Sequence, residues 1–516
     1  MADLEKAGFR AGPSTVANGS VGSPDLQFDL APAQDATPPI KGLSWYHKLE
    51  KQLVAHNFES RGIRRVAPDE RHDLKSLGNM QAGLLWFSIN LAANNITLGM
   101  LGPTVFYLGF TDACLLAVFG AIVGCLPVAY IATFGSRSGN RTLVVARYAM
   151  GWWPAKLIVL LNLIVSTGYS MIDAVVAGQM LSAVSPNDSM SVIVGIVIVA
   201  VITWAITCFG YQIVHYYERY AWIPQIIVIS ILAGVAGQSF DLSSQTTGDT
   251  ALTRLGDRLS FFSLNLSAAI TYAGAGADYF VYYPESTPRW KIFLAVMVGL
   301  VTSFTYAFII GIGLGSGVAS VPAWTSAYSI SQGALIVEGY APIGGFGKFC
   351  AVVIALGLVA NMIPPTYSSG VDFQILGTWF MRIPRVFLNT LIVVIYTVCA
   401  IAGRDHLAEI FTNFLALMGY FVAIWIAIQL EEHLIFRWWG GRGWNWAVWD
   451  DRSKLPIGIA ALIAFLVGWA GAVSAVLLLL RGCFDAVANT KSRSCRWRRC
   501  GILGHLHTIW VTMVAM

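Results

Sequence analysis

The chain has little of what marks a soluble or secreted protein. Only 12% of its 516 residues are charged, whereas a soluble domain carries about a quarter. Its eight cysteines are scattered and form neither a disulfide framework nor a metal-ligand spacing. No charged start followed by a short apolar core opens the chain, so no secretory signal is expected. These absences disfavour a soluble enzyme, a disulfide-rich secreted protein and a metalloprotein.

Long apolar runs are what the chain has instead. The hydrophobic share is 56% and the mean hydropathy is +0.63. Runs of about 20 residues without period-2 alternation favour membrane-spanning helices over barrel strands. The predicted spans are 82–110, 113–134, 155–184, 191–210, 220–238, 260–283, 291–315, 346–370, 385–403, 407–430 and 456–480. The pattern predicts an all-α polytopic membrane protein.

Composition divides the chain into four parts. Residues 1–40 are rich in Ala, Gly, Ser, Pro and Asp and predict a disordered cytoplasmic tail, and 41–81 form a charged cytoplasmic lead-in. Residues 82–480 are predicted to form the transmembrane domain. The last segment, 481–516, is basic and would lie outside, against the positive-inside rule. Our hypothesis is that a shifted reading frame or an unspliced intron encodes this atypical tail, which sequencing of the transcript tests.

Loop charges predict the orientation of the chain. With the N-terminus inside, cytoplasmic loops hold thirteen basic residues and the opposite loops hold four. Excess Lys and Arg on one side is typical of cytoplasmic loops. The sequence therefore predicts a cytoplasmic N-terminus.

Two of the predicted spans contain helix breakers at corresponding places. The first run contains Gly99, Gly102 and Pro103, and the sixth contains Gly274 and Gly276. These runs are the first members of two five-helix halves, and interrupted helices at matching positions of inverted repeats indicate a midplane binding site. Close helix packing is the alternative explanation of the glycines.

The eighth run predicts a third irregular helix. Pro364 and Pro365 follow Asn361, and two prolines leave carbonyl groups without their helical donors. Such groups are tolerated at membrane depth where they line a cavity or face protein.

Two carboxylates, Asp173 and Asp278, lie inside apolar runs. A charge in hydrocarbon costs about 2.5–3.5 kcal/mol even on insertion scales, so such acids mark pathways or sites. No Lys or Arg lies mid-span to partner Asp173. Asp278 has an alternative role as a structural cap of the re-formed sixth helix.

Several short motifs occur at and around these breaks. They are Trp86-Phe87-Ser88-Ile89-Asn90, Leu101-Gly102-Pro103, Ala277-Asp278-Tyr279, Tyr282-Tyr283-Pro284-Glu285 and Ala360-Asn361 with Pro364. In these motifs the chain resembles the fungal purine–cytosine permeases of the nucleobase-cation-symport-1 family, and the resemblance extends over about residues 45–475. The resemblance implies a leucine-transporter-type five-plus-five inverted repeat with 11–12 helices. It also implies proton-coupled uptake of cytosine and purines across the plasma membrane.

The resemblance also implies a set of substrate-binding positions. They are Ser88 on the first helix, Tyr169 and Asp173 on the third, Tyr272 on the sixth and Asn361 on the eighth. Positions departing from the commoner family pattern are Tyr169, Asp173, Tyr272 and Pro365. Because of these departures, family membership does not specify the nucleobase.

The chemistry of these residues suits a flat heteroaromatic solute. Tyrosine rings offer stacking faces, an ionised Asp173 accepts from amine and ring N–H groups, and Asn361 both donates and accepts. Asp278 is the candidate coupling site, because burial favours the protonated form of a carboxyl group. The alternatives are interhelical packing for the tyrosines, a helix cap for Asn361 and a backbone hydrogen bond for Ser88.

The sequence therefore predicts a proton-coupled symporter of nucleobases (cytosine and/or purines) in the plasma membrane, with no enzyme activity, cofactor, metal or nucleic acid. Its expected partners are the heteroaromatic substrate, the proton and the lipid bilayer. Transport of pyridoxine (vitamin B6) or another small heteroaromatic compound is one alternative, and a non-transporting pseudo-transporter is another. A membrane-embedded enzyme would need a clustered catalytic set, but the eight histidines are scattered.

Overall fold

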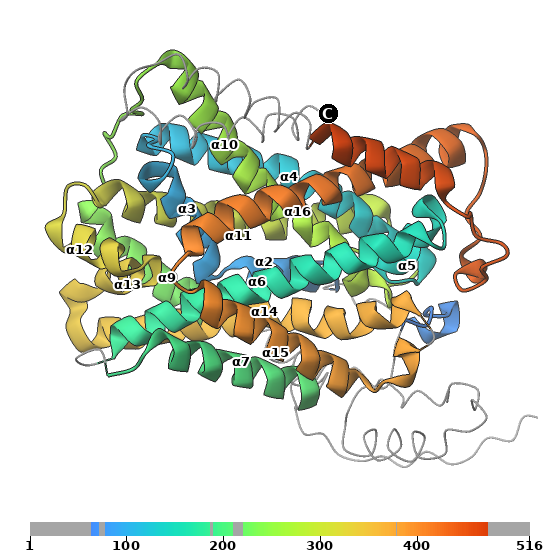
Figure 1. Cartoon of the computed structure of the whole chain (residues 1–516), viewed down its shortest axis with the longest axis horizontal. Coiled ribbons are helices and arrows are strands. Elements are labelled where there is room, and N and C mark those ends of the chain that lie inside the picture. Colours follow the sequence, from blue (N-terminus) through green and yellow to red (C-terminus); the bar gives the residue numbers. More distant parts are fainter. Residues whose placement is uncertain (1–62, 72–77, 186–188, 210–219, 378, 473–516) are drawn as a thin grey trace, which may run out of the picture. The chain divides into compact units, whose positions relative to one another are not determined.

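The structure is a computed structural model that describes residues 63–71, 78–185, 189–209, 220–377 and 379–472, all within one unit of the chain. The predicted tail 1–40, the basic segment 481–516 and most of the lead-in 41–81 lie outside the described residues. Helices, without a strand, form the regular structure of the described part (Figure 1). The α-helices of the transmembrane domain up to the sixth span are α2 (Gly78–Asn90), α3 (Ala93–Thr104), α4 (Phe110–Ser138), α5 (Thr142–Met150), α6 (Pro154–Val184), α7 (Val192–Phe209), α9 (Trp222–Ala236) and α10 (Ala251–Ile270). The later ones are α11 (Arg289–Gly317), α12 (Pro322–Ile330), α13 (Gln332–Glu338), α14 (Gly344–Leu376), α15 (Arg385–Gly403), α16 (Leu407–Glu431) and a helix over Ile459–Ala472.

Every predicted span coincides with helical structure over its described residues, which leave out 473–480 of the eleventh span. In the described part of the chain, seven helices are long and apolar enough to cross a membrane by themselves, and the bent pair α2 and α3 makes an eighth span. Two shorter apolar helices, Val192–Cys208 and Ile459–Ala472, correspond to the fourth and eleventh predicted spans. The sixth predicted span is α10 with the two short 3₁₀ segments that follow it. The all-α polytopic prediction is confirmed.

The first span is broken, but upstream of the predicted glycines. α2 and α3 meet at an angle of 57° around Leu91 and Ala92. Asparagine amides satisfy the backbone there, because Asn90 Nδ2 donates to the Trp86 carbonyl oxygen and Asn95 Nδ2 to that of Asn90.

The predicted breakers of the first span belong instead to a continuous helix. Gly99 lies within α3, where an added Cβ would be 2.4 Å from the Phe308 carbonyl oxygen of α11. Close packing, the alternative explanation, accounts for this glycine. Pro103 lies in the last turn of α3.

The sixth span changes from α-helix to 3₁₀ geometry where the sequence predicted a break. α10 ends at Ile270, and the 3₁₀ segments η4 (Thr271–Ala275) and η5 (Asp278–Phe280) follow. Gly274 permits a close approach, since a Cβ there would be 1.9 Å from Asn162 Oδ1 of α6. Here the predicted interruption coincides with its glycines.

The eighth span is regular, which corrects the prediction of a third irregular helix. α14 runs without interruption from Gly344 to Leu376, through both Pro364 and Pro365. The prolines remove the amide donors for the carbonyls of Ala360 and Asn361. Their rings are nevertheless accommodated in a helix that packs against several neighbours, including α6, α7 and α15.

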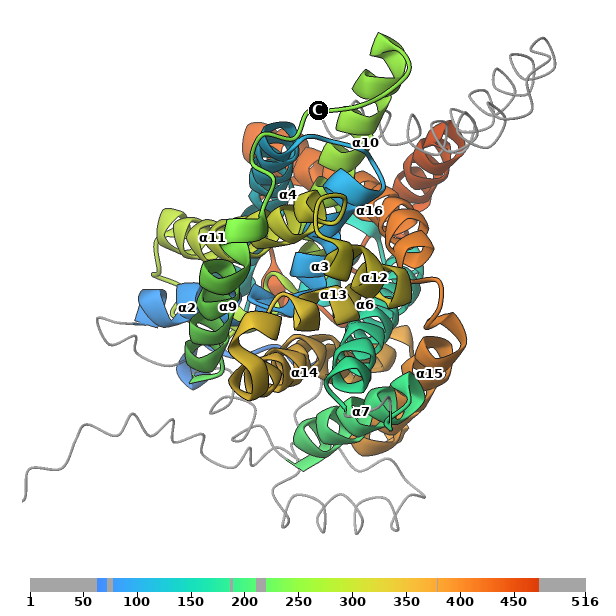
Figure 2. The same cartoon turned by 90° about the vertical axis from the view of Figure 1, so that its left-hand side faces the viewer.

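α6 and α11 each pack against several other helices. α6 lies along α14, while α11 packs against α2, α3 and α4 (Figures 1 and 2). The glycines of α11 allow this contact: a Cβ on Gly311 would be 2.0 Å from the Ile96 carbonyl oxygen, and one on Gly315 would be 2.8 Å from that of Met100. These two glycines therefore permit close packing of α11 against α3.

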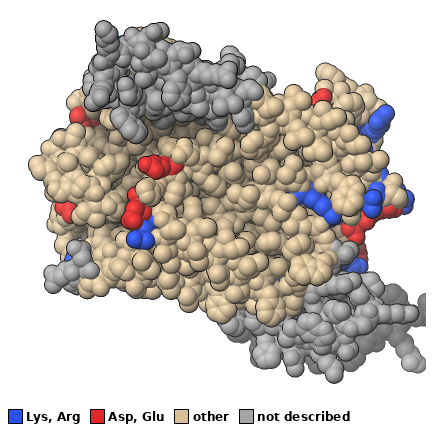
Figure 3. All heavy atoms as spheres, in the orientation of Figure 1, with Lys and Arg blue, Asp and Glu red and all other residues tan. Residues whose placement is uncertain are grey.

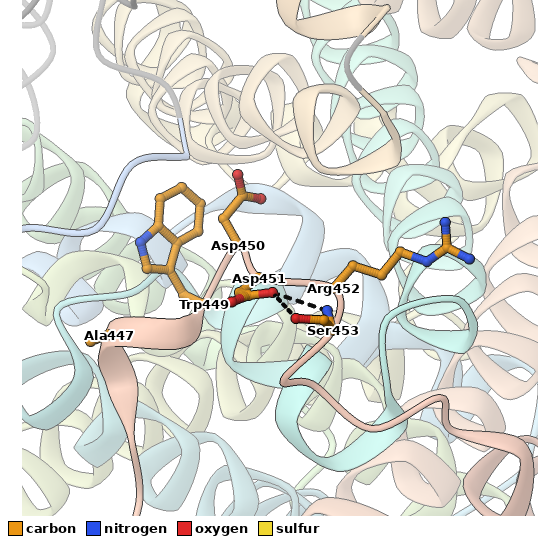
Figure 4. Close-up of a pocket in the computed structure, with 6 residues that line it drawn as sticks. All are labelled: Ala447, Trp449, Asp450, Asp451, Arg452 and Ser453. Atoms are coloured by element: carbon orange, nitrogen blue, oxygen red, sulfur yellow. Dashed lines mark hydrogen bonds between the residues drawn. The ribbon is translucent and has the colours of Figure 1, made fainter.

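Charged side chains lie toward two ends of the molecule on the face shown in Figure 3. A broad band of uncharged side chains separates them, as expected of a surface in contact with lipid. One charged end includes the loop after α16, where a shallow pocket is lined by Ala447, Trp449, Asp450, Asp451, Arg452 and Ser453 (Figure 4). Hydrogen bonds from Ser453 and Lys454 lower the pKa of exposed Asp451 to about 2. This pocket is formed by a surface loop and contains none of the predicted binding residues.

Candidate functional site

Aromatic side chains from four spans meet where the sixth span loses its α-helical geometry. The Tyr169 ring on α6 lies 6.0 Å from the Tyr272 ring on η4, measured between centroids. Trp86 of α2 and Phe304 of α11 contact the Tyr272 ring edge-on, at 6.3 Å and 5.9 Å. Tyr169 and Tyr272 are half-buried, so part of each ring surface remains accessible. The predicted pair of aromatic faces therefore comes together, with Trp86 as an unpredicted neighbour.

Tyr169 also holds the end of α10. Its hydroxyl donates to the Ala268 carbonyl oxygen at 3.1 Å and lies 2.7 Å from Thr271 Oγ1. These groups flank the transition from α-helix to 3₁₀ structure. The tyrosine thus fixes the sixth span while presenting its ring beside Tyr272.

Asp173 is a buried carboxyl group that forms no hydrogen bond of normal geometry within the described residues. It lies on α6 one turn after Tyr169, is fully buried and acts electrostatically on Tyr169 and Tyr272. The Asn94 side chain of α3 is near, but within the described residues neither carboxyl oxygen of Asp173 forms a hydrogen bond of normal geometry. Burying an acid in this way is costly unless another group satisfies it.

Asn361 links the eighth span to the break of the first. Its Nδ2 donates to the Ile89 carbonyl oxygen at 2.7 Å, and it lies 3.5 Å from the Tyr272 hydroxyl oxygen. Asn361 therefore caps the end of α2, and a helix cap was its alternative predicted role. It also lies beside the aromatic pair. Ser88 is buried beside Ile89, and in the described part of the chain its Oγ has no hydrogen-bond partner.

Asp278, the predicted coupling residue, has a different environment. Its Oδ1 accepts hydrogen bonds from the Thr142 amide and hydroxyl, both at 2.7 Å, and Arg141 Nη1 lies 3.6 Å from Oδ2. These contacts attach η5 to the first residue of α5. Asp278 therefore caps a neighbouring helix and has a counter-charge, unlike Asp173.

The structure thus brings Tyr169, Asp173, Tyr272 and Asn361 together and places Ser88 at the same break. A second buried acid, Asp372 of α14, was not among the predicted residues; its Oδ2 accepts from Asn162 Nδ2 at 2.9 Å. It follows the predicted end of the eighth span, residue 370, by two residues. Within the described residues, no cluster of three or more His, Cys, Asp and Glu side chains is arranged to hold a metal ion.

Two interrupted spans, with a buried acid and aromatic rings between them, define the class as a secondary transporter. The chain belongs to the family of permeases for cytosine/purines, uracil, thiamine and allantoin, which it matches over residues 73–441. As a member of a permease family, it is a transporter rather than an enzyme.

Relatives with two different substrates are similarly close to this chain. The purine-cytosine permease fcyB of Emericella nidulans is 34% identical, with 84% of each chain covered. The vitamin B6 transporter TPN1 of Saccharomyces cerevisiae is 32% identical, with 82% of each chain covered. Sequence similarity at this level does not separate the two substrate classes.

Solved structures show the same fold at low sequence identity. Mhp1, a nucleobase-cation-symport-1 family transporter, superimposes with a TM-score of 0.57 at 14% identity, covering 88% of this chain and 95% of its own. MhsT in complex with L-phenylalanine gives a TM-score of 0.51, also at 14% identity, covering 86% of this chain and all of its own. The fold is therefore of the leucine-transporter type, as the resemblance implied.

Proposed function

We propose that this protein is a proton-coupled symporter that takes up nucleobases, cytosine and/or purines, across the plasma membrane. The buried and unpartnered carboxyl of Asp173 is the observation that carries this proposal. An acid at membrane depth with no protein partner is satisfied when a substrate N–H group reaches it. Cytosine and adenine offer such groups on a planar ring.

The proposed binding mode uses five side chains from four spans. The base stacks on the accessible faces of Tyr169 and Tyr272, which adds about 0.5–1.5 kcal/mol beyond area burial. Asp173 accepts from the exocyclic amine or a ring N–H. The Asn361 amide nitrogen is occupied by Ile89, so its oxygen accepts from the base, while Ser88 Oγ donates or accepts.

Pyridoxine is the second candidate substrate. TPN1 is nearly as similar to this chain as fcyB. A carboxylate at Asp173 also suits the protonated ring nitrogen of a pyridine, because a charge-assisted hydrogen bond is about twice as strong as a neutral one.

The proposed orientation places the N-terminus in the cytoplasm. The lead-in supports it, because the Val66 amide donates to the Gly139 carbonyl oxygen and Arg65 Nε donates to that of Ser138. Residues 63–71 thus contact the α4–α5 connection, which includes Arg141 and follows Arg137 of the last turn of α4. Asp278 remains a candidate coupling group, but its ion pair with Arg141 gives it less support than the sequence suggested.

Uptake by a transporter-null cell tests the proposal. Radiolabelled cytosine, adenine and pyridoxine are supplied with and without a proton gradient, at matched surface expression. We expect saturable uptake of a nucleobase that falls when a protonophore removes the gradient. Uptake of pyridoxine alone would select the second candidate, gradient-independent uptake would refute proton coupling, and no uptake of any compound would indicate a pseudo-transporter.

A further inference from the structure

A second polar contact joins α6 and α14 away from the substrate residues. Asn162 precedes Asp173 in α6 and Asp372 follows Asn361 in α14, each by about 16 Å along its helix at 1.5 Å per residue. The two helices lie side by side (Figure 1), and Asn162 Nδ2 donates to Asp372 Oδ2 at 2.9 Å. This contact therefore lies toward the end of the pathway that the proposed orientation places in the cytoplasm.

The same asparagine is pressed against the non-α-helical segment of the sixth span. A Cβ on Gly274 would lie 1.9 Å from Asn162 Oδ1, so the amide occupies the space that a side chain would fill. Asn162 thus contacts the sixth span with its oxygen and Asp372 with its nitrogen. One amide connects η4 to both α6 and α14.

The amide of Asn162 is the hydrogen-bond donor that the described residues supply to Asp372. Of the charged groups nearby, Asp278 acts on Asp372 with the same sign of charge and Arg141 with the opposite sign. Arg141 already forms an ion pair with Asp278 at 3.6 Å. A buried carboxylate in this position depends on the hydrogen bond from Asn162.

We propose that Asn162 and Asp372 are positioning residues that form an inner latch, which holds the sixth span against α6 and α14 and closes the cytoplasmic side of the pathway. The latch rests on the proposed transport function and on its orientation. Alternating access in transporters with inverted repeats requires one group of helices to move relative to another around the site. Breaking the single amide contact would release η4 for that movement.

Thiol accessibility tests the latch without measuring transport. Ser369 is fully buried on α14, one turn before Asp372, so Ser369→Cys reports opening of this region. Inside-out vesicles are treated with a membrane-impermeant thiol reagent, and the protein without Ser369→Cys gives the background from native cysteines. We expect Asp372→Ala to label about tenfold faster than the latch-intact protein, as the loss of one hydrogen bond to a charged group predicts. Asp372→Asn keeps an acceptor without the charge and should label at an intermediate rate.

Gly274→Ala provides an independent variant because it displaces Asn162 and leaves Asp372 and Asp278 in place. Gly370→Ala is its matched control, since a Cβ there would lie 2.0 Å from Asn389 Oδ1 in a contact outside the latch. Faster labelling with Gly274→Ala but not with Gly370→Ala supports the latch. Equal rates in Asp372→Ala, Gly274→Ala and the latch-intact protein would overturn it, as would equal acceleration by both glycine variants. Loss of the uptake described above leaves this readout interpretable, so failure of the two proposals can be distinguished.

Discussion

Replacing Asp173 by asparagine removes a negative charge from the candidate site while preserving side-chain shape. Asp173 is fully buried and forms no hydrogen bond of normal geometry within the described residues, so the Asn94 side chain is the polar neighbour that the substitution affects. A hydrogen bond to a charged group contributes about 1.5–3 kcal/mol and a neutral one about 0.5–1.5 kcal/mol. The difference, about 1–1.5 kcal/mol, predicts a KM for the transported base about 5- to 13-fold higher. Because the lost energy is binding energy, the maximal rate should change little.

Asp173→Leu extends the series, because it removes the acceptor as well as the charge. Its KM should rise by about 10- to 150-fold, which corresponds to a whole hydrogen bond to a charged group. Asp257→Asn is the matched control: Asp257 is also buried, but lies about 20 Å before the end of α10. Initial uptake rates over a range of base concentrations, normalised to surface protein, give KM for each variant. An unchanged KM in both Asp173 variants would refute the assigned contact, and an equal rise in Asp257→Asn would show that the effect is not local.

The remaining predictions distinguish effects on substrate binding from effects on folding and stability. Ser88→Ala should raise KM about 2- to 13-fold and leave the melting temperature unchanged, since its hydroxyl has no hydrogen-bond partner among the described residues. Asn361→Leu should instead lower thermal stability in detergent by about 1–3 kcal/mol, because the Ile89 carbonyl loses its donor; an unchanged melting temperature would contradict the capping role. Arg141→Gln should lower the folded yield by leaving Asp278 uncompensated, and adding Asp278→Asn should restore it, as fluorescence-detected chromatography can measure. The pKa of Asp451 is lowered from its usual 3.8 to about 2, so its contribution to folding stability is complete above about pH 4 and is lost only as pH falls toward 2. Asp451→Asn should therefore leave the pH profile of uptake between pH 5 and 7 unchanged.

The spans and the fold class were predictable because hydrocarbon permits few solutions. A run of about 20 apolar residues without alternation has to satisfy its own backbone, which only a helix does. The extent of each helix was less predictable, because polar residues near a span end resemble loop. Asp372 illustrates this, since α14 continues past residue 370 to Leu376 and carries the acid into the protein interior. Its partner Asn162 gave no signal either, because only three-dimensional proximity joins them.

Residue roles at the site were less predictable than residue positions. The family resemblance implied that Tyr169 and Asn361 belong to the site, where the ring of one and the amide of the other would contact the substrate. The structure adds that each also holds a helix end, Tyr169 through the Ala268 carbonyl and Asn361 through that of Ile89. Side-chain partners on other helices decide such roles, and single-chain patterns do not specify them.

The location of a helix break in this protein depends on available hydrogen-bond partners more than on glycine or proline. Pro364 and Pro365 remove two donors, yet α14 continues, whereas α2 ends at Asn90 without either residue type. At that end, amide side chains replace the missing helical bonds, from Asn95 to the Asn90 carbonyl and from Asn361 to the Ile89 carbonyl. Because an unsatisfied backbone group costs several kcal/mol in lipid, a span can open only where such substitutes exist. Clustered asparagines within an apolar run are therefore the stronger sequence signal of a break, and the first span contains three of them between Gly83 and Gly99.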